Sequence, residues 1–237
     1  MKRVLILQHE WDNPSGLVGE ILQEYHIASD TIHVRNAPIP ESIAYDAIVA
    51  FGGSQHVYEE DKYPYFTQEK TIIRQAVEQD IPYLGICLGG QLLAGALNSP
   101  VRQHSMTELG FFTVHMTEAG KADPLYAGLP GYQTVFHWHA DTFDIPAGAI
   151  LLATNENTEN QAFRYGPRAY GLQYHIEVTP EMLDTWLYHP DLKESIIGTI
   201  GIDGYTTIER ERPIHYPTYE AHTRIIFKNF LRISGLI

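Results

Sequence analysis

The sequence predicts an α/β fold: a doubly wound, mostly parallel sheet with helices on both faces and antiparallel strands added to it. Up to residue 98, short apolar runs alternate with segments of helical spacing. Strands that alternate with helices form parallel sheets whose two faces are both covered. After residue 98 the strand-like segments follow one another with short breaks at Gly, Pro and Asn, which is typical of hairpins.

The first half of the chain contains four expected strands, two expected helices between them, and a helix-like segment at 90–97. The strands are apolar or β-branched runs at residues 3–8, 31–35, 46–53 and 81–87. Apolar residues at helical spacing predict helices over 16–25 and 66–80, with one face made of Leu17, Ile21, Leu22 and Tyr25 in the first, and of Ile72, Ile73, Ala76 and Val77 in the second.

The second half begins with strands and ends with helices. Strands are expected at 108–117, 132–141, 149–155, 161–166 and 168–175. Thr179 as N-cap, followed by Pro180, marks the start of a helix. A last helix over 218–233 would bury Tyr219, Ile226, Phe227 and Phe230 on one face. We expect a single domain over 1–237, with a helical C-terminal extension at about 190–237.

Composition excludes several classes of function. The 16 Lys and Arg against 29 Asp and Glu give a formal charge of −13, which argues against a nucleic-acid-binding or anionic-membrane-binding surface. One cysteine allows no internal disulfide. The N-terminus resembles no signal peptide, and no apolar stretch approaches the length of a membrane span. We therefore expect a cytoplasmic protein with no membrane partner.

The single cysteine lies in the segment GICLGGQ, where an apolar strand precedes it and a helix is expected to follow. Gly85 and Gly89, two positions to either side of Cys87, match the pattern of a nucleophile on a sharp turn between strand and helix. The helix N-terminus would favour the thiolate, which is the reactive form. The alternative is a small core residue, because free cysteines are often buried.

A thiolate nucleophile usually needs a histidine that carries protons and a further group that orients it. Among twelve histidines, His175 stands out because it ends an expected strand and Glu177 follows two residues later. The two side chains can project to the same side, so that the carboxylate holds the imidazole.

Five segments in order resemble the class I, triad-type, glutamine amidotransferases, and within them the stand-alone proteins similar to the amidotransferase domain of GMP synthase. The segments are HEWDNPSG (9–16), AFGGSQHVYEEDKYPYF (50–66), YLGICLGGQLLA (83–94), FHWHADTFDIP (136–146) and QAFRYGPRAYGLQYHIEVTPEML (161–183). The resemblance implies a flavodoxin-like doubly wound fold.

The resemblance also implies a role for each matching residue. Cys87 would attack the side-chain amide of glutamine, His175 would relay protons, and Glu177 would orient His175. The backbone N–H groups of Gly53 and Leu88 would form the oxyanion hole. Glutamine would be held by Gln91 and by the backbone of Trp138, His139, Ala140 and Asp141. Neither a cofactor nor a metal is expected.

Three positions depart from the usual pattern of the family. Ile176 replaces the proline between the histidine and the glutamate, as in the stand-alone subgroup. Ser54 replaces a proline after the glycine pair, so this loop keeps an N–H and loses some rigidity. Ala140 stands where glycine is common before Asp141.

The segment HWHAD also allows a metal interpretation. His137 and His139 alternate along a strand onto one face, and with Asp141 and His175 they could form a zinc or iron site. This would leave the cysteine turn unexplained, so it is the less favoured interpretation. His9, His56 and His104 are expected in loops near the C-terminal edge of the sheet, each as a surface residue rather than a functional one.

The chemistry predicted for Cys87 leaves three functions open. No P-loop motif is present, so the first is a glutaminase that passes ammonia to a separate synthetase. The second is a γ-glutamyl hydrolase or peptidase that forms the same thioester from a larger γ-glutamyl compound. The third, a catalytically silent regulatory module, is disfavoured by the intact set of Cys87, His175 and Glu177.

Overall fold

The computed structural model describes residues 2–237. These residues contain one nine-stranded sheet with the strand order β2-β1-β3-β4-β9-β8-β7-β5-β6. The strands are β1 (Arg3–Gln8), β2 (Ala28–His33), β3 (Ala47–Ala50), β4 (Tyr83–Ile86), β5 (Val101–Met116), β6 (Tyr132–Phe143), β7 (Ile150–Thr154), β8 (Ala162–Tyr165) and β9 (Ala169–Leu172).

The expected combination of a parallel sheet with added antiparallel strands is confirmed. Strands β2, β1, β3, β4 and β9 are parallel neighbours, whereas β9-β8, β8-β7, β7-β5 and β5-β6 pair in antiparallel fashion. The parallel strands read as continuous apolar runs because both faces are buried. In β1, Val4 and Ile6 face one core and Leu5 and Leu7 face the other.

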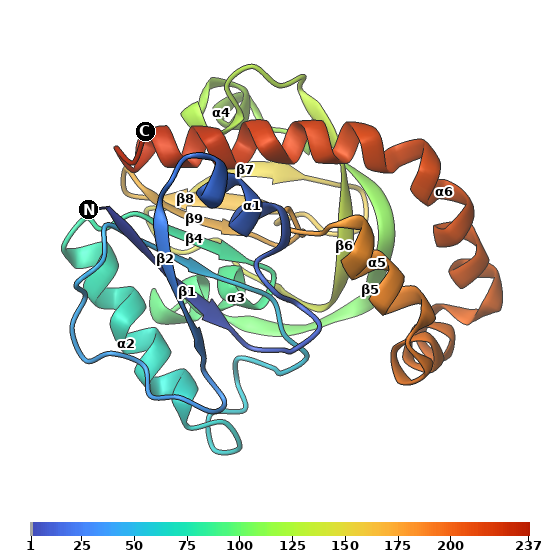
Figure 1. Cartoon of the computed structure of the whole chain (residues 1–237), viewed down its shortest axis with the longest axis horizontal. Coiled ribbons are helices and arrows are strands. Elements are labelled where there is room, and N and C mark those ends of the chain that lie inside the picture. The colour runs from blue at the N-terminus through green and yellow to red at the C-terminus, as the bar shows by residue number, and fades with distance from the viewer. Residues whose placement is uncertain (1) are drawn as a thin grey trace.

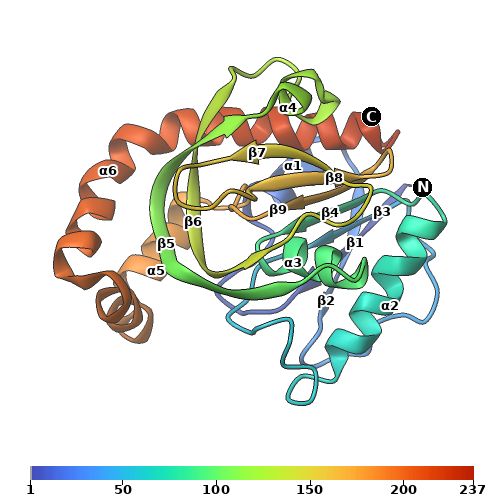
Figure 2. The same ribbon diagram turned by 180° about the vertical axis from the view of Figure 1, so that it is seen from behind.

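Helices cover both faces of the sheet (Figure 1). The helices α1 (Gly16–Glu24) and α6 (Pro190–Ile233) pack on the face of Val4 and Ile6, and α2 (Tyr65–Glu78) and α3 (Leu88–Ala96) pack on the other. Seen from behind, α3 lies across the sheet and the long β5 curves around the antiparallel half (Figure 2). The shorter elements are α4 (Glu118–Ala122), the 3₁₀ helix η1 (Pro124–Tyr126) and α5 (Pro180–Tyr188).

Some boundaries differ from those expected from the sequence. β9 ends at Leu172, three residues before His175, because its pairing with β8 ends at Leu172. The chain then turns toward β6, where the backbone N–H of His175 donates to the carbonyl of Phe136 at 2.9 Å. The histidine is therefore held at the switch from the parallel to the antiparallel half of the fold.

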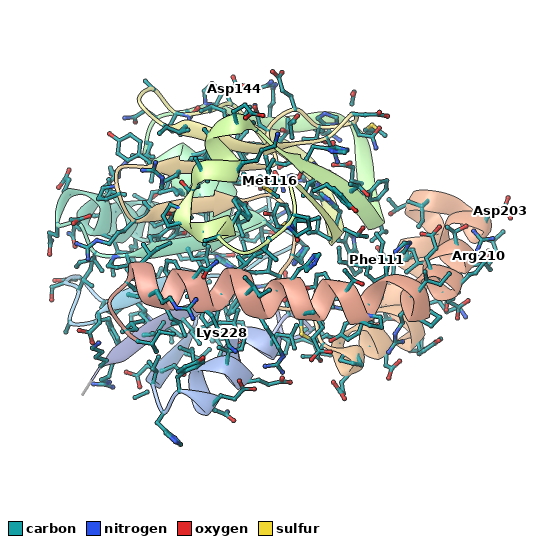
Figure 3. All side chains as sticks on the ribbon, turned by 90° about the horizontal axis from the view of Figure 1, so that it is seen from above. Phe111, Met116, Asp144, Asp203, Arg210 and Lys228 are labelled. Atoms are coloured by element: carbon teal, nitrogen blue, oxygen red, sulfur yellow. The ribbon has the colours of Figure 1, made fainter. Side chains whose placement is uncertain are left out.

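The last part of the chain forms α5 and the 44-residue α6. Thr179 caps α5 as expected, its hydroxyl accepting from the Met182 N–H at 3.2 Å. α6 is interrupted at Gly201, which has φ +74° and ψ 170°, a conformation that favours glycine. Beyond it the helix crosses the molecule, and Figure 3 shows Lys228 over the body while Asp203 and Arg210 lie beyond the sheet. The face predicted for the last helix is buried: Tyr219, Ile226, Phe227 and Phe230.

No helix formed by residues 2–237 combines the length and the apolar character that crossing a bilayer requires.

Candidate active site

Cys87 stands between β4 and α3 on a strained turn. Its φ of +53° and ψ of −110° are unusual for any residue other than glycine. The two flanking glycines are required: a Cβ at Gly85 would lie 2.3 Å from the Gly89 carbonyl oxygen, and one at Gly89 would lie 2.2 Å from the Ala50 oxygen. A cysteine that only filled the core would have no use for such a backbone, so this geometry favours the nucleophile over the core residue.

His175 is held by Glu177 as the spacing predicted. The Nδ1 atom of His175 lies 2.6 Å from Glu177 Oε1, and Glu177 Oε2 accepts from the Ile176 N–H at 2.9 Å. Burial acts to lower the pKa of His175, but the charge of Glu177 and the Cys87 thiol outweigh it and raise the pKa well above its usual value. A protonated His175 at neutral pH stabilises a thiolate at Cys87.

The cysteine and the histidine meet beside Gly52. A Cβ built on Gly52 would lie 2.9 Å from His175 Cε1 and 3.4 Å from Cys87 Cβ. The Nε2 atom of His175 is buried and has no hydrogen-bond partner within residues 2–237, so this nitrogen is available to the thiol. The thiol itself lies 3.6 Å from the Trp138 carbonyl oxygen.

Gly53 and Leu88, whose N–H groups are expected to bind an oxyanion, are neighbours in space. A Cβ on Gly53 would lie 2.8 Å from Leu88 Cδ2. Leu88 is the first residue of α3, where helix N–H groups lack an intrahelical acceptor. Within the part of the chain that the structure describes, neither N–H donates a hydrogen bond to a protein group.

A pocket of about 410 Å³ opens in front of Cys87. Most of the residues selected from the sequence line it: Gly53, Cys87, Gln91, Trp138, His139, Ala140, Asp141 and His175. Glu177 and Leu88 lie behind this lining. The sequence reasoning missed other lining residues, among them Asp12, Asn13, Gln55, Trp186, Leu192, Ser195 and Thr199.

The side chains of the expected substrate-binding residues point in different directions. Gln91 Nε2 donates to Gln173 Oε1 at 3.3 Å beside the cysteine. Asp141 Oδ2 lies 2.7 Å from His56 Nδ1 at the pocket wall. His139 turns its ring away from the pocket toward buried Glu108, with 3.0 Å between Nε2 and Oε2. The ring of His139 is therefore tied to Glu108, and this contact anchors the backbone of β6 beside the pocket.

Glu108 is the centre of a buried polar cluster that was not foreseen. Besides His139, it accepts hydrogen bonds at 2.7–3.3 Å from the side chains of Asn155, Asn157, Thr158 and Gln161. Burial acts to raise the pKa of Glu108, but these donors and the nearby histidines hold it well below its usual range. Burial lowers the pKa of His137 to about 3, so this neighbour is neutral.

The geometry also corrects the metal interpretation. Within residues 2–237, the potential ligand atoms that converge within 4.8 Å belong to Glu108, His137 and His139. Asp141 instead contacts His56, and His175 contacts Glu177. The carboxylate oxygens of Glu108 already accept several hydrogen bonds, so a charge-assisted hydrogen-bond network accounts for the cluster without an ion.

Two histidines expected at the surface have partners instead. His9 is buried, with its Nε2 3.0 Å from Glu69 Oε2, so that expectation was wrong. His56 is partly exposed but contacts Asp141 in the pocket.

Comparison with known proteins settles the family. The model of the family described as glutamine amidotransferase class-I matches residues 16–193, which include the cysteine turn and the His175–Glu177 pair. The chain belongs to the class I glutamine amidotransferases.

Relatives of this amidotransferase include stand-alone proteins and a domain of a larger enzyme. The glutamine amidotransferase-like protein YfeJ of Salmonella typhimurium is 35% identical over 168 residues, 70% of each chain. A glutamine amidotransferase from Thermotoga maritima superposes with a TM-score of 0.82 at 32% identity, covering 97% of this chain and 98% of that one. GMP synthase of Staphylococcus aureus is 35% identical over 133 residues, 55% of this chain but only 24% of the synthase.

Proposed function

We propose that this protein hydrolyses the side-chain amide of glutamine through a γ-glutamyl thioester on Cys87. The observation that carries the proposal is the strained cysteine on the strand-to-helix turn, next to a histidine that Glu177 orients at 2.6 Å. A regulatory module without catalysis would not need this set of groups, so the geometry favours an enzyme over a silent module.

In the first half-reaction the Cys87 thiolate attacks the amide carbon, and the new S–C bond pushes the carbonyl electrons onto oxygen. The N–H groups of Gly53 and Leu88, which donate to no protein group within residues 2–237, would stabilise this oxyanion. His175 then donates its proton to the leaving nitrogen, the C–N bond breaks, and ammonia leaves. In the second half-reaction neutral His175 takes a proton from water, which attacks the thioester and releases glutamate.

The glutamyl part of the substrate would lie beside Gln91 and the backbone of Trp138–Asp141. Glutamine carries an α-ammonium group, for which the Asp141 carboxylate on the pocket wall is a matching charge. His56 and Tyr58 fix this carboxylate, with contacts at 2.7 and 3.4 Å. With His56 and Tyr58 holding it, Asp141 would bind the α-ammonium group of the substrate.

A separate synthetase is the partner that this reaction suggests. The sequence similarity to GMP synthase covers only about a quarter of the length of that enzyme. We infer that the ammonia can be passed to a synthetase on another chain, in the cytoplasm expected for a protein with a single reduced cysteine.

The experiment uses the fact that the chain has one cysteine. Purified protein is incubated with glutamine, and separately with 6-diazo-5-oxo-norleucine, an electrophilic glutamine analogue. We expect ammonia release and a single covalent adduct at Cys87, both abolished in Cys87→Ser. Failure of the analogue to label the wild-type protein at pH 7 would overturn the proposal, because labelling needs no partner.

A further inference from the structure

The residues that line the pocket come from two groups of elements, and Cys87 and His175 lie among them. The glutamyl side is formed by residues of the β3–α2 loop, α3 and β6, namely Gly53, Ser54, Gln55, His56, Gln91 and Asp141. The amine side, as we name it, is formed by the β1–α1 loop, α5 and the start of α6, with Trp11, Asp12, Trp186, Leu192, Ser195 and Thr199.

The leaving group must depart on the side of His175, because this residue gives the leaving nitrogen its proton. His175 packs edge-on against Trp186, with ring centroids 5.6 Å apart, and Trp186 packs in the same way against Trp138 at 5.3 Å. Trp186 Nε1 donates to the Asp12 carbonyl oxygen at 2.9 Å, which joins α5 to the β1–α1 loop. The amine side is thus the place where the leaving group is released.

This side offers more contact surface than ammonia can use. The whole pocket, about 410 Å³, is in the range of sites for drug-sized ligands, about 300 to 1,000 Å³, whereas glutamine is smaller. Trp11 is 63% exposed and packs edge-on against His189 at 5.4 Å, so a large apolar ring stands at the pocket mouth. Leu192, Ser195 and Thr199 complete an uncharged wall.

Asp12 sets the charge of the amine side. Its carboxylate receives no hydrogen bond or ion pair from another side chain within residues 2–237, in contrast with Glu10, which is held by Arg35 and Ser54. Burial and the charge of Glu10 raise the pKa of Asp12, while its own backbone N–H and the nearby His175 and His189 lower it. Among residues 2–237 no Lys or Arg lines the pocket, so a second carboxylate there would be repelled.

We propose that the preferred substrates are γ-glutamyl amides of aliphatic amines that carry a second, positively charged amino group, rather than glutamine or γ-glutamyl dipeptides. The alkyl chain would pack on Trp11, Trp186 and Leu192, and the ammonium group would pair with Asp12 and lie on the indole faces. The inference rests on the proposed thioester chemistry. The amide C–N bond breaks, the amine leaves with a proton from His175, and water releases glutamate from Cys87.

Four substrates test the proposal: glutamine, γ-glutamyl-butylamide, γ-glutamyl-(4-aminobutyl)amide and γ-glutamyl-norleucine. Glutamate release is measured for each as kcat/KM. We expect the aminobutyl amide to exceed glutamine at least tenfold, with the butyl amide between them and the dipeptide lowest. Equal or better turnover of glutamine or the dipeptide would overturn the inference.

Two variants test which residues of the amine side determine this substrate preference. Asp12→Asn should reduce the ratio of aminobutyl to butyl amide turnover about tenfold, and Trp11→Ala should reduce both relative to glutamine. Asp203→Asn, which changes an exposed carboxylate on α6 that is not part of the pocket lining, is the matched control and should change no ratio. An unchanged ratio in Asp12→Asn would refute the role of the carboxylate.

The outcomes separate the two proposals. If the diazo analogue labels Cys87 and glutamine is the best substrate, the amine side is not a substrate subsite and the proposed function stands. If the analogue leaves Cys87 unmodified, the thioester chemistry itself fails.

Discussion

Replacing Glu108 with glutamine should destabilise the protein and impair catalysis, although Glu108 does not line the pocket. The substitution keeps the shape of the side chain and removes its charge. It also places an NH₂ group where a carboxylate oxygen accepts from two or more donors, because Oε2 receives His139, Thr158 and Gln161, and Oε1 receives Asn155 and Asn157. In either orientation of the new amide, its NH₂ group would face at least two side chains that are themselves hydrogen-bond donors.

The magnitude follows from the burial of this network. Glu108 is buried, and each buried donor that loses its acceptor costs about 1 to 3 kcal/mol, so two such donors cost about 2 to 6 kcal/mol. For a chain of this length each kcal/mol lowers Tm by about 2 to 4 °C, which gives a decrease of roughly 4 to 24 °C. Because the His139 ring anchors the backbone from Trp138 to Asp141, we also expect at least a tenfold loss of kcat/KM for glutamine.

Calorimetry of Glu108→Gln, with Glu118→Gln as the control, tests the predicted decrease in Tm. Glu118 is 90% exposed and forms a surface ion pair with Lys121, so its variant should shift Tm by less than about 2 °C. The pKa of Glu108 is depressed in the folded state, so its contribution is present at neutral pH and is lost as the pH falls below about 4. The difference in Tm between wild type and Glu108→Gln should therefore shrink at low pH. A Tm of Glu108→Gln within 2 °C of wild type at pH 7 would refute the reasoning.

The fold could be predicted from the sequence because the patterns that indicate its strands and helices are local. Apolar runs such as Arg3–Gln8, followed by helical spacing, fix a parallel sheet covered on both faces, and the hairpin-like second half extends the same sheet. The boundaries were less predictable because they depend on neighbouring strands. β9 ends at Leu172, where its pairing with β8 ends, and nothing in the local sequence shows that.

The residues of the candidate site also differ in whether a local sequence pattern predicts them. Cys87 and the His175–Glu177 pair have signals within a few residues, namely glycines two positions away and an i, i+2 carboxylate. Glu108 has no such signal. Its position is defined by the β5–β6 register, in which it lies opposite His139, and a bulge between Gln103 and Glu108 sets that register.

Two residues of the pocket wall show more clearly what cannot be predicted from the sequence. Asp12 and Trp186 are 174 residues apart in the chain and meet through one hydrogen bond of 2.9 Å. Each looks like an ordinary loop or helix residue on its own. Only the folded chain shows that they border the same cavity as Cys87.

Two further substitutions test the contact between the cysteine and the histidine. Gly52→Ala would place a Cβ 2.9 Å from His175 Cε1 and should reduce turnover by about a hundredfold, while Gly198→Ala, whose Cβ would meet nothing within 4 Å, should leave activity and folding unchanged. Equal activity of the two variants would contradict the placement of His175. Glu177→Gln removes the charge that most strongly raises the pKa of His175 against the opposing effect of burial. In the wild type the imidazolium is present at neutral pH and stabilises the thiolate, so iodoacetamide should alkylate Cys87 well below pH 8. In Glu177→Gln the imidazole is neutral, and the alkylation rate should rise only near pH 8.5, the pKa of an ordinary thiol. Superimposable rate–pH profiles would show that the pair does not activate Cys87.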